Sequence, residues 1–422
     1  MKIPRRDLLK TGVGAAVLAS LPSCLKPPSP RLSAPPSEAG WVRAKMETHR
    51  VPGVGIAMVE DAAVVWEQGF GFKNLLTRDP VTQGTLFQAA SLSKPIFAYV
   101  VMGLVEHGEL ALDDALVDYV RPADLAEGPW GEQITVRDAL QHTSGLPNWR
   151  ADKDGPDPLR PAYAPGTDTS YSGEAYHWLQ RVVEKVTGLG LDALMRERLF
   201  RPAALDDMAM VWDPSRDARE VFGHVFNDAD ELVVDDLQFI REHGGRLNEV
   251  AVRWGRPMRT WTAQDHERAA LEIRPHTHPR LKDEPAWAWA RPGAFIIDSA
   301  SSLRSTAGDY ARFVAMMMPG RGPGGGQRGE ATRQRLLTPQ YERPDVQGGV
   351  LPRGLGWGLE KRENGVAFYH WGKNGRSHMS VALGDATTRR GIVVMTNGSN
   401  GKALIRDVVT ELMGTNYIGI TT

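Results

Sequence analysis

One apolar run constrains the fold of this 422-residue chain more than any other stretch. The run is Ile96–Val105, and its residues would be hydrophobic on every face of a helix. It is too short to span a bilayer, so it predicts a helix buried in the middle of a globular domain. Gly108 follows at the position where glycine commonly ends a helix.

A hydroxyl and an amine lie three residues apart at the start of this run. Ser91 and Lys94 would share one face of the helix because residues three apart stack on one side. A helix N-terminus favours negative charge, which suits a serine nucleophile activated by a lysine. The alternative is that Ser91 only caps the helix and Lys94 is solvated. This stretch alone leaves both interpretations open.

The Ser-x-x-Lys spacing is weak evidence by itself. Ser23 and Lys26 share it, and so do Ser399 and Lys402. Both of these pairs lie in polar or proline-rich surroundings, with no apolar run behind them. The predicted burial of the following helix therefore singles out Ser91, and the spacing does not.

Composition excludes several classes of function. The chain is 41% hydrophobic and 24% charged with a formal net charge of −1, so nothing indicates binding to nucleic acid. A single cysteine, Cys24, permits no intramolecular disulfide and no cysteine-rich metal site. His276 and His278 lack a third nearby ligand, which favours a structural role. We expect no metal and no cofactor.

The N-terminal residues 1–24 have the pattern of an export signal. Arg5 and Arg6 form a twin-arginine pair, and the apolar segment Thr11–Leu21 follows. That segment has the length of a signal-peptide core and is too short for a membrane span. We therefore expect export by the Tat route to the periplasm.

Cys24 ends this signal in the sequence Leu21-Pro22-Ser23-Cys24, which resembles a bacterial lipobox. Pro22 is unusual in such a motif, and cleavage nearby would instead release a soluble periplasmic protein. Residues 25–38 are proline-rich and predict an extended spacer. We expect a lipid on Cys24 to be the only attachment to the membrane, and the sequence does not predict an oligomeric state.

The remaining pattern predicts an α+β fold. Val54–Val59 and Ala63–Gln68 indicate a hairpin, and four short strands are expected between Gly356 and Thr396. A closing helix is expected at Ala403–Met413. We predict one domain over residues 39–415 and a tail at 416–422. Its antiparallel sheet, from about 52–75 and 354–397, would be flanked by helices and joined to a mainly helical lobe at about 110–300.

Further helices are expected in the middle of the chain. The segment 213–292, with its scattered tryptophans, is expected to form long loops and short helices, either packing on the core or lining a cleft. Gly320–Gly325 matches a nucleotide-binding glycine pattern but follows a helix, so we expect a flexible loop there. The predicted helices are Ile134–His142 capped by Thr135, Glu174–Val186, Leu191–Leu199 and Ser302–Met318.

Three stretches in order resemble the beta-lactamase and penicillin-binding-protein superfamily. Phe87–Lys94 carries Ser-x-x-Lys, Pro165–Gly173 stands in place of the Tyr-x-Asn loop, and His370–Gly372 stands in place of the Lys-Thr-Gly strand. Ile134–Pro147 resembles the connection between the first two motifs. The resemblance covers most of residues 39–415, in the branch of class C beta-lactamases, D-alanyl-D-alanine carboxypeptidases and related esterases. Each motif is weak singly, and the ordered set is specific.

The resemblance implies a role for each of these residues. Ser91 would be the nucleophile, and Lys94 and Tyr171 the general base pair; which of the two takes the first proton stays open. The backbone N–H groups of Ser91 and Lys373 would form the oxyanion hole. His370 would orient Tyr171 or contact the substrate. Taken alone, Tyr171 would be interpreted as a core tyrosine in a turn, and His370 as a histidine satisfied on a strand; Ser91 and the order of the motifs favour the catalytic roles.

The sequence departs from the family pattern at two positions. Gly173 replaces the asparagine that contacts the acylamino group of lactams and peptides, and Trp371 replaces a smaller residue and would narrow the cleft. Gly372 matches the pattern and would let the strand lie close to a substrate. These departures favour hydrolysis of an ester or amide in a small-molecule or peptide substrate, with weak beta-lactam turnover at most.

Two other functions compete with the hydrolase. One is a non-catalytic penicillin-binding-like module that recognises cell-wall peptide. The other is an α+β scaffold of the cell envelope. Retention of Ser91, Lys94 and Tyr171 together favours the enzyme.

Overall fold

The computed structural model describes residues 40–150, 158–235, 238–274, 297–319, 327–342, 352–413 and 417–421. The predicted signal with Cys24, the spacer, the pair His276 and His278, and the loop Gly320–Gly325 lie outside these ranges. Within the ranges, no helix is long and apolar enough to cross a membrane.

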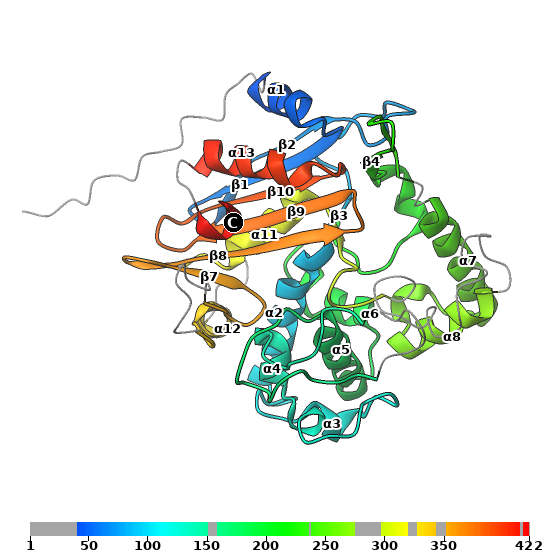
Figure 1. Cartoon of the computed structure of the whole chain (residues 1–422), viewed down its shortest axis with the longest axis vertical. Helices are drawn as coiled ribbons and strands as arrows, with labels where there is room; N and C mark the ends of the chain where they lie inside the picture. The colour runs from blue at the N-terminus through cyan, green and yellow to red at the C-terminus, as the bar shows by residue number, and fades with distance from the viewer. Residues whose placement is uncertain are drawn as a thin grey trace, which may run out of the picture.

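A single antiparallel sheet of six strands is the frame of the molecule (Figure 1). The N-terminal hairpin joins the C-terminal strands because β1 pairs with β10 along its length. This confirms that the two predicted groups of strands form one sheet. In the order β2-β1-β10-β9-β8-β7 the strands are Ala63–Gly71, Gly53–Glu60, Arg390–Thr396, His378–Asp385, Gly365–Asn374 and Gly358–Arg362.

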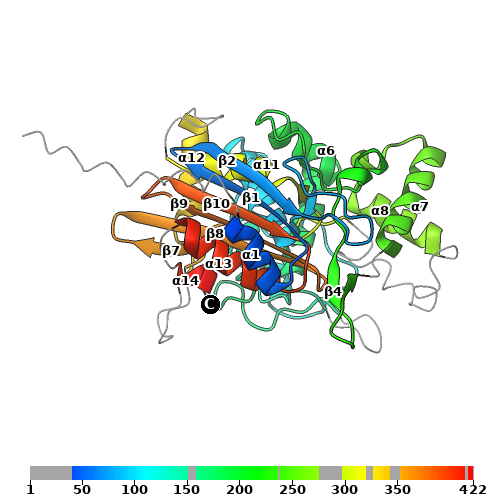
Figure 2. The same cartoon turned by 90° about the horizontal axis from the view of Figure 1, so that it is seen from above.

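Helices cover both faces of the sheet (Figure 2). On β1, Val54 and Ile56 face one hydrophobic core, and Ala57 and Val59 face the other. This alternation follows from the two-residue period of a strand. One face is covered by α1 (Gly40–His49), α13 (Gly401–Met413) and α14 (Ile418–Thr421), and the other by α11 (Ala307–Met316).

The predicted apolar helix is α2, Ser93–Glu106, and it lies in the interior. The 3₁₀ turn Ala90–Leu92 precedes it and carries Ser91. Gly108 follows with φ +72°, a conformation that glycine adopts without steric cost. Burial of α2 between the sheet and the helical lobe confirms the central prediction from sequence.

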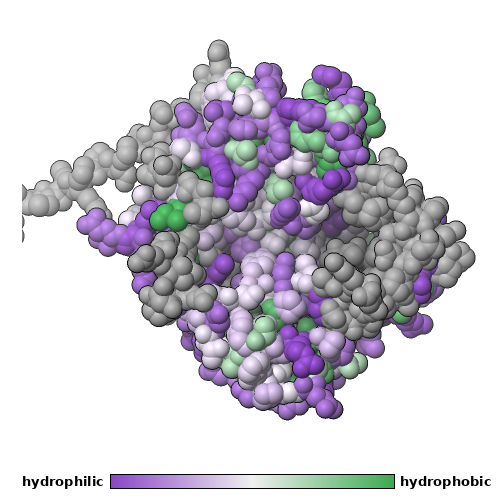
Figure 3. Space-filling model, in the orientation of Figure 1, coloured by the Kyte–Doolittle hydropathy of each residue, from purple (hydrophilic) through white to green (hydrophobic). Residues whose placement is uncertain are grey.

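The helical lobe lies at one end of the sheet (Figure 1), and its described surface is mainly hydrophilic on the face drawn in Figure 3. Thr135 caps α4 as predicted, in a reciprocal capping box with Asp138. The helix expected at Leu191–Leu199 starts as α6 and continues as a π-helical segment, Arg196–Phe200. The helices of the lobe are α3 (Leu116–Tyr119), α4 (Val136–Gln141), α5 (Gly173–Thr187) and α6 (Leu191–Met195).

The described residues of the segment 213–292, which are 213–235 and 238–274, differ from the prediction of loops and short helices. They include a small hairpin, β4 (His224–Phe226) and β5 (Leu232–Val234), and two substantial helices, α7 (Gln238–Trp254) and α8 (Ala263–Ile273). These helices lie beside the lobe and have a small core of their own, in which Trp261 is fully buried (Figure 1). The prediction missed them because their apolar residues pack on each other, while charged residues cover the outside.

The helix expected at Ser302–Met318 begins later, at Ala307. Arg304–Ser305 forms a short strand, β6, that pairs with β3 (Phe87–Gln88). Thr306 then caps α11 by accepting a hydrogen bond from the backbone of Asp309. The β3–β6 pairing attaches the segment just before Ser91 to a distant part of the chain.

Candidate active site

The residues predicted for catalysis converge between the sheet and the helical lobe. Ser91 lies on the 3₁₀ turn before α2, and Lys94 lies in the first turn of α2. Tyr171 precedes α5, and His370 lies on β8. The ring of Tyr171 lies 4.5 Å from Lys94 Nζ and 5.9 Å from the His370 ring. Four residues from three separate stretches of sequence therefore share one site.

The Lys94 side chain is buried at this site, with 1% of its surface exposed. Its Nζ lies 3.4 Å from Ser91 Oγ and donates a hydrogen bond of 3.0 Å to the carbonyl oxygen of Ala300. Burial lowers the pKa of Lys94 to about 7, against the opposing charge of Asp298. A substantial fraction of Lys94 is therefore neutral near pH 7 and able to accept a proton.

Asp298 supports Lys94, and the sequence analysis did not single it out. It is fully buried and accepts hydrogen bonds from the hydroxyls of Ser301 and Ser302 and from the backbone N–H of Ala300. Burial raises its pKa, which the hydrogen bond from Ser301 and the charge of Lys94 oppose. These contacts fix the turn that presents the Ala300 carbonyl to Lys94. The Asp-Ser-Ala-Ser-Ser sequence is a turn signal that could have pointed to this loop.

Tyr171 is partly buried, with its hydroxyl next to the nucleophile. Burial raises its pKa above the ordinary value, although the hydroxyl of Ser91 acts in the opposite direction. Its Oη makes no hydrogen bond of good geometry with the described residues. Tyr171 is therefore protonated at rest, and its hydroxyl remains available to a substrate.

His142 is a second residue of the site to which the sequence analysis gave no role. It ends α4 with φ +66°, and its ring lies 4.4 Å from the ring of Tyr171. Its Nδ1 accepts a hydrogen bond of 3.1 Å from the backbone N–H of Ser172. Burial lowers its pKa well below the ordinary value, so the ring is neutral. His142 thus holds the Tyr171 segment in place without adding charge.

His370 and Trp371 face opposite sides of β8, as neighbouring residues of a strand do. His370 is 5% exposed, and burial lowers its pKa to about 3, so its ring is neutral near pH 7. The indole of Trp371 packs against the hydrophobic core on the face of the sheet that α13 covers. It donates a 2.8 Å hydrogen bond to the carbonyl of Gly419. The expectation that Trp371 narrows the cleft is therefore wrong.

Gly372 allows β8 to approach the turn that carries Ser91. A Cβ at this position would lie 2.4 Å from the carbonyl oxygen of Ala89 and 2.1 Å from Ser380 Oγ. Ser380 in turn donates a 2.8 Å hydrogen bond to the Ala89 carbonyl. The pairing of β7 with β8 stops at Tyr369, so residues 370–374 have an edge that β7 leaves unpaired. This edge of β8 lies close to Ser91 and suits an oxyanion hole that includes the Lys373 N–H. The side chain of Lys373 is exposed.

Ala90 holds the nucleophile in a strained turn. Its φ of +53° lies in the left-handed region, which costs a residue with a Cβ about 1–2 kcal/mol. Strain of this kind persists where the surrounding structure enforces it, and functional sites commonly contain it.

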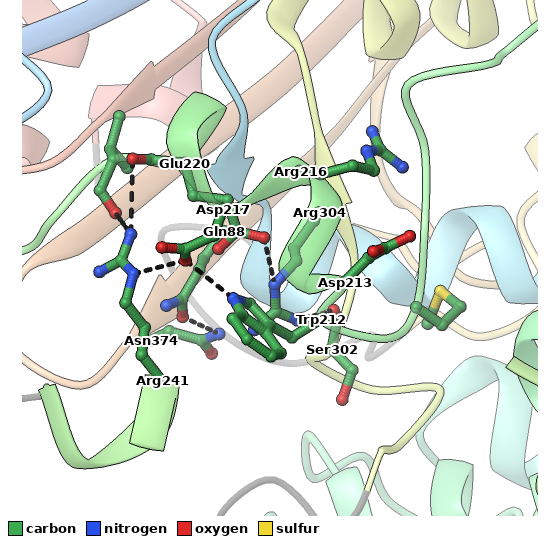
Figure 4. A network of polar contacts seen from close by, with 12 residues as sticks. Gln88, Trp212, Asp213, Arg216, Asp217, Glu220, Arg241, Ser302, Arg304 and Asn374 are labelled. Carbon is green, nitrogen blue, oxygen red and sulfur yellow. Dashed lines mark hydrogen bonds and ion pairs between the residues drawn. The ribbon is translucent and has the colours of Figure 1, made fainter. Parts of the chain in front are cut away.

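A network of polar contacts surrounds Gln88, on the segment that leads to Ser91 (Figure 4). Asn374, at the end of β8, donates hydrogen bonds of 3.2 Å to the side chain of Gln88 and to the carbonyl of Ser301. Gln88 lies three residues before Ser91. The network therefore joins the Ser91 segment, β8 and the loop that holds Lys94.

Behind Asn374 the charges are paired with one another. Arg304 lies 2.9 Å from Glu220, and Arg241 donates a 2.6 Å hydrogen bond to Asp217, which also accepts from the Trp212 indole (Figure 4). The space left among these groups is about 20 Å³, room for one water molecule. This part of the network is therefore a supporting wall and offers no room for a substrate group.

A family model fits this sequence across most of the fold, from before α1 into α13. The model of the beta-lactamase family matches residues 39–409. The chain belongs to the beta-lactamase family. Membership agrees with the resemblance drawn from Ser91, Tyr171 and His370, and it makes the protein a member of a family of serine hydrolases.

Solved structures of the family share the fold. A D-alanine carboxypeptidase AmpC from Burkholderia cenocepacia aligns with a TM-score of 0.62 at 20% identity, over 89% of this chain and 99% of the other. An octameric penicillin-binding protein homologue from Pyrococcus abyssi aligns with a TM-score of 0.64 at 19% identity, over 89% and 77%. At these identities the likeness concerns the fold alone.

Curated relatives are similar over part of the chain. Penicillin-binding protein 4* of Bacillus subtilis is 27% identical over 215 residues, 46% of this chain and 46% of the relative. A D-aminopeptidase of Brucella anthropi is 30% identical over 191 residues, 41% of this chain and 35% of the relative. The chain therefore spans less than half of the length of these relatives.

We predict that Gly372→Ala abolishes most of the activity. The new methyl group would push β8 away from the Ala89 carbonyl, and a displacement of about 1 Å at a reacting centre can cost about 100-fold in rate. Gly103→Ala in α2 is the matched control, because a Cβ there meets nothing within 4 Å. Steady-state hydrolysis of an activated ester measures both variants. Equal activity of the two would show that the approach of β8 does not matter.

Replacement of Lys94 should make stability less dependent on pH. Because burial lowers the pKa from 10.5 to about 7, the unfolded chain binds more protons between these values. Wild-type stability therefore rises with pH in this window, by up to about 1.4 kcal/mol per unit. Lys94→Met removes this dependence, so its stability relative to wild type is greatest below pH 7 and declines towards pH 10. Denaturant unfolding at pH 6 and pH 9 tests this, and an equal difference at both values contradicts it.

Proposed function

We propose that this protein is a serine hydrolase that acts through an acyl-enzyme intermediate on Ser91 and cleaves an ester or amide. The observation that carries the proposal is the buried amine of Lys94, 3.4 Å from Ser91 Oγ, with its pKa lowered to about 7. A buried lysine without a carboxylate in contact is costly to stability, and such groups cluster at functional sites.

The geometry supports a two-step reaction. Lys94 takes the proton of Ser91 as Oγ attacks the substrate carbonyl carbon, either directly or by a relay in which the Tyr171 hydroxyl accepts that proton and passes its own to Lys94. The backbone N–H groups of Ser91 and Lys373 would stabilise the resulting oxyanion. Tyr171 would then protonate the leaving alcohol or amine and regain a proton from Lys94, and the carbonyl re-forms as an ester on Ser91 as the bond to the leaving group breaks. Water activated by the same pair would attack that ester and release the acid and free Ser91.

The second candidate is a non-catalytic module that recognises cell-wall peptide. The names of the relatives favour a peptide ligand, because they include penicillin-binding proteins and a D-aminopeptidase. The strained Ala90 and the buried Lys94 favour chemistry instead, since binding alone requires neither. Gly173 removes the amide that the family uses for acylamino groups, which favours simpler esters or amides.

We also propose that the protein acts in the periplasm. The twin-arginine pair Arg5-Arg6 and the apolar segment behind it support export, and Cys24 supports a lipid anchor. A hydrolase anchored by a lipid on Cys24, and joined to that anchor by the spacer 25–38, would meet cell-envelope substrates at the membrane.

Intact-mass measurement after exposure to p-nitrophenyl acetate tests the nucleophile. We expect one acetyl adduct on the wild-type chain and none on Ser91→Ala. Ser399→Ala is the matched control, because Ser399 has the same spacing to a lysine, and it should keep the adduct. An adduct that persists in Ser91→Ala would contradict the assignment.

A panel of p-nitrophenyl esters, a chromogenic cephalosporin and D-alanyl peptides then separates the two candidate functions. Turnover of any of them supports the enzyme, and the rank order identifies the substrate class. Binding of D-alanyl peptide with no adduct and no turnover across the panel would instead establish the recognition module.

A further inference from the structure

The indole of Trp149 occupies the space of the side chain that Gly173 lacks. Gly173 is the first residue of α5 and lies two residues after Tyr171. A Cβ at this glycine would lie 2.5 Å from Cζ2 and 2.7 Å from Cε2 and Cη2 of Trp149. Real Cβ atoms do not approach a ring so closely, so a side chain at position 173 and an indole in this position exclude each other.

Hydrogen bonds fix the two residues before Trp149 to the start of α5. The carbonyl oxygen of Asn148 accepts hydrogen bonds of 3.0 Å from the N–H groups of Gly173 and Glu174. Ser172 Oγ donates a 2.9 Å hydrogen bond to the carbonyl of Pro147. Such a wall is preorganised and needs no rearrangement to meet a ligand.

An ion pair holds the residue that follows Trp149. Arg150 Nε lies 2.9 Å from Glu174 Oε1, and the guanidinium also pairs with Asp124. Glu174 is buried and follows Gly173 in α5, so this ion pair also fixes the residue after Trp149 to the start of α5. Trp149 therefore sits between two anchored residues, and its indole is only partly buried.

The Trp149 ring lies against a segment of chain that also carries one of the reacting groups. The segment 171–173 carries Tyr171, whose ring lies 4.5 Å from Lys94 Nζ. The Trp149 ring lies against Gly173, so a group that extends from an acylated Ser91 past Tyr171 towards the start of α5 would meet it. The ring face offers dispersion contacts and no hydrogen-bond acceptor. An acylamino group placed against it would lose hydrogen bonds to water without replacement, a cost of about 1–3 kcal/mol.

We infer that Trp149 is a specificity-determining wall that selects apolar acyl groups and rejects acylamino groups. The inference rests on the proposed function and names its substrate class: esters or amides of simple aliphatic or aromatic acids. Gly173 is then a requirement of the wall, because any larger residue would displace the indole.

Two esters with the same leaving group and acyl chains of similar length test the inference. They are p-nitrophenyl hexanoate and the p-nitrophenyl ester of N-acetylglycine. For wild type we expect kcat/KM to favour the hexanoate at least tenfold. Trp149→Phe retains a ring and should keep the preference, whereas Trp149→Ala should reduce it at least tenfold.

A paired exchange makes the test sharper. In the Trp149→Ala background, Gly173→Asn supplies an amide where the indole was, and the preference should shift further towards the N-acetylglycine ester. Gly173→Asn alone forces the indole out of place, and we expect kcat/KM to fall for both esters. If Trp149→Ala and the paired exchange leave the wild-type ratio of the two esters unchanged, the inference is overturned.

The acetyl adduct on Ser91 separates this result from failure of the proposed function. A wild-type chain that forms the adduct but hydrolyses both esters equally overturns the role of Trp149 and leaves the hydrolase intact. A wild-type chain that forms no adduct and hydrolyses neither ester overturns both. Thermal unfolding of each variant identifies one that fails to fold, and Trp149→Leu then replaces Trp149→Ala.

Discussion

Burial of the Lys94 amine is the constraint on which the rest of this site depends. The apolar helix α2 carries Lys94 into the interior, and the loop at 298–302 supplies one carbonyl oxygen and one carboxylate nearby. The aromatic rings of Tyr171 and Tyr176 next to the amine are uncharged, because burial raises the pKa of both. Because no carboxylate in the described part of the chain forms an ion pair with the amine, its proton is held weakly, and this is the property that a general base near neutral pH requires.

Close packing of β8 against the turn before α2 is the second constraint. It depends on a sheet assembled from both ends of the chain, with β1 and β10 as the joint. Gly372 removes the side chain that would separate the two segments, and the hydrogen bond from Ser380 to Ala89 holds them together. The network around Asn374 then attaches the loop that fixes Lys94. These contacts thus hold α2 and β8 in fixed positions relative to Ser91.

Patterns within one element could be predicted from the sequence, and contacts between distant elements could not. The uninterrupted apolar run identified α2, and the order of three short motifs identified Ser91, Tyr171 and β8. The placement of Asp298 next to Lys94 could not be predicted, because the loop that carries it lies some 200 residues away in sequence. The helices α7 and α8 were missed because they pack chiefly on each other. The orientation of Trp371 could have been predicted: a residue between His370 and Gly372 must face the other side of the strand.

The most direct test of this account is the pH dependence of Ser91 acylation, measured as the single-turnover burst with a p-nitrophenyl ester. Deprotonation of Lys94 should control the rate, so we predict a rate that rises with pH through a midpoint near 7 and then levels off. Lys94→Met should lose both the rate and this midpoint. A rate independent of pH between 5.5 and 9, or a burst that persists in Lys94→Met, would contradict the account.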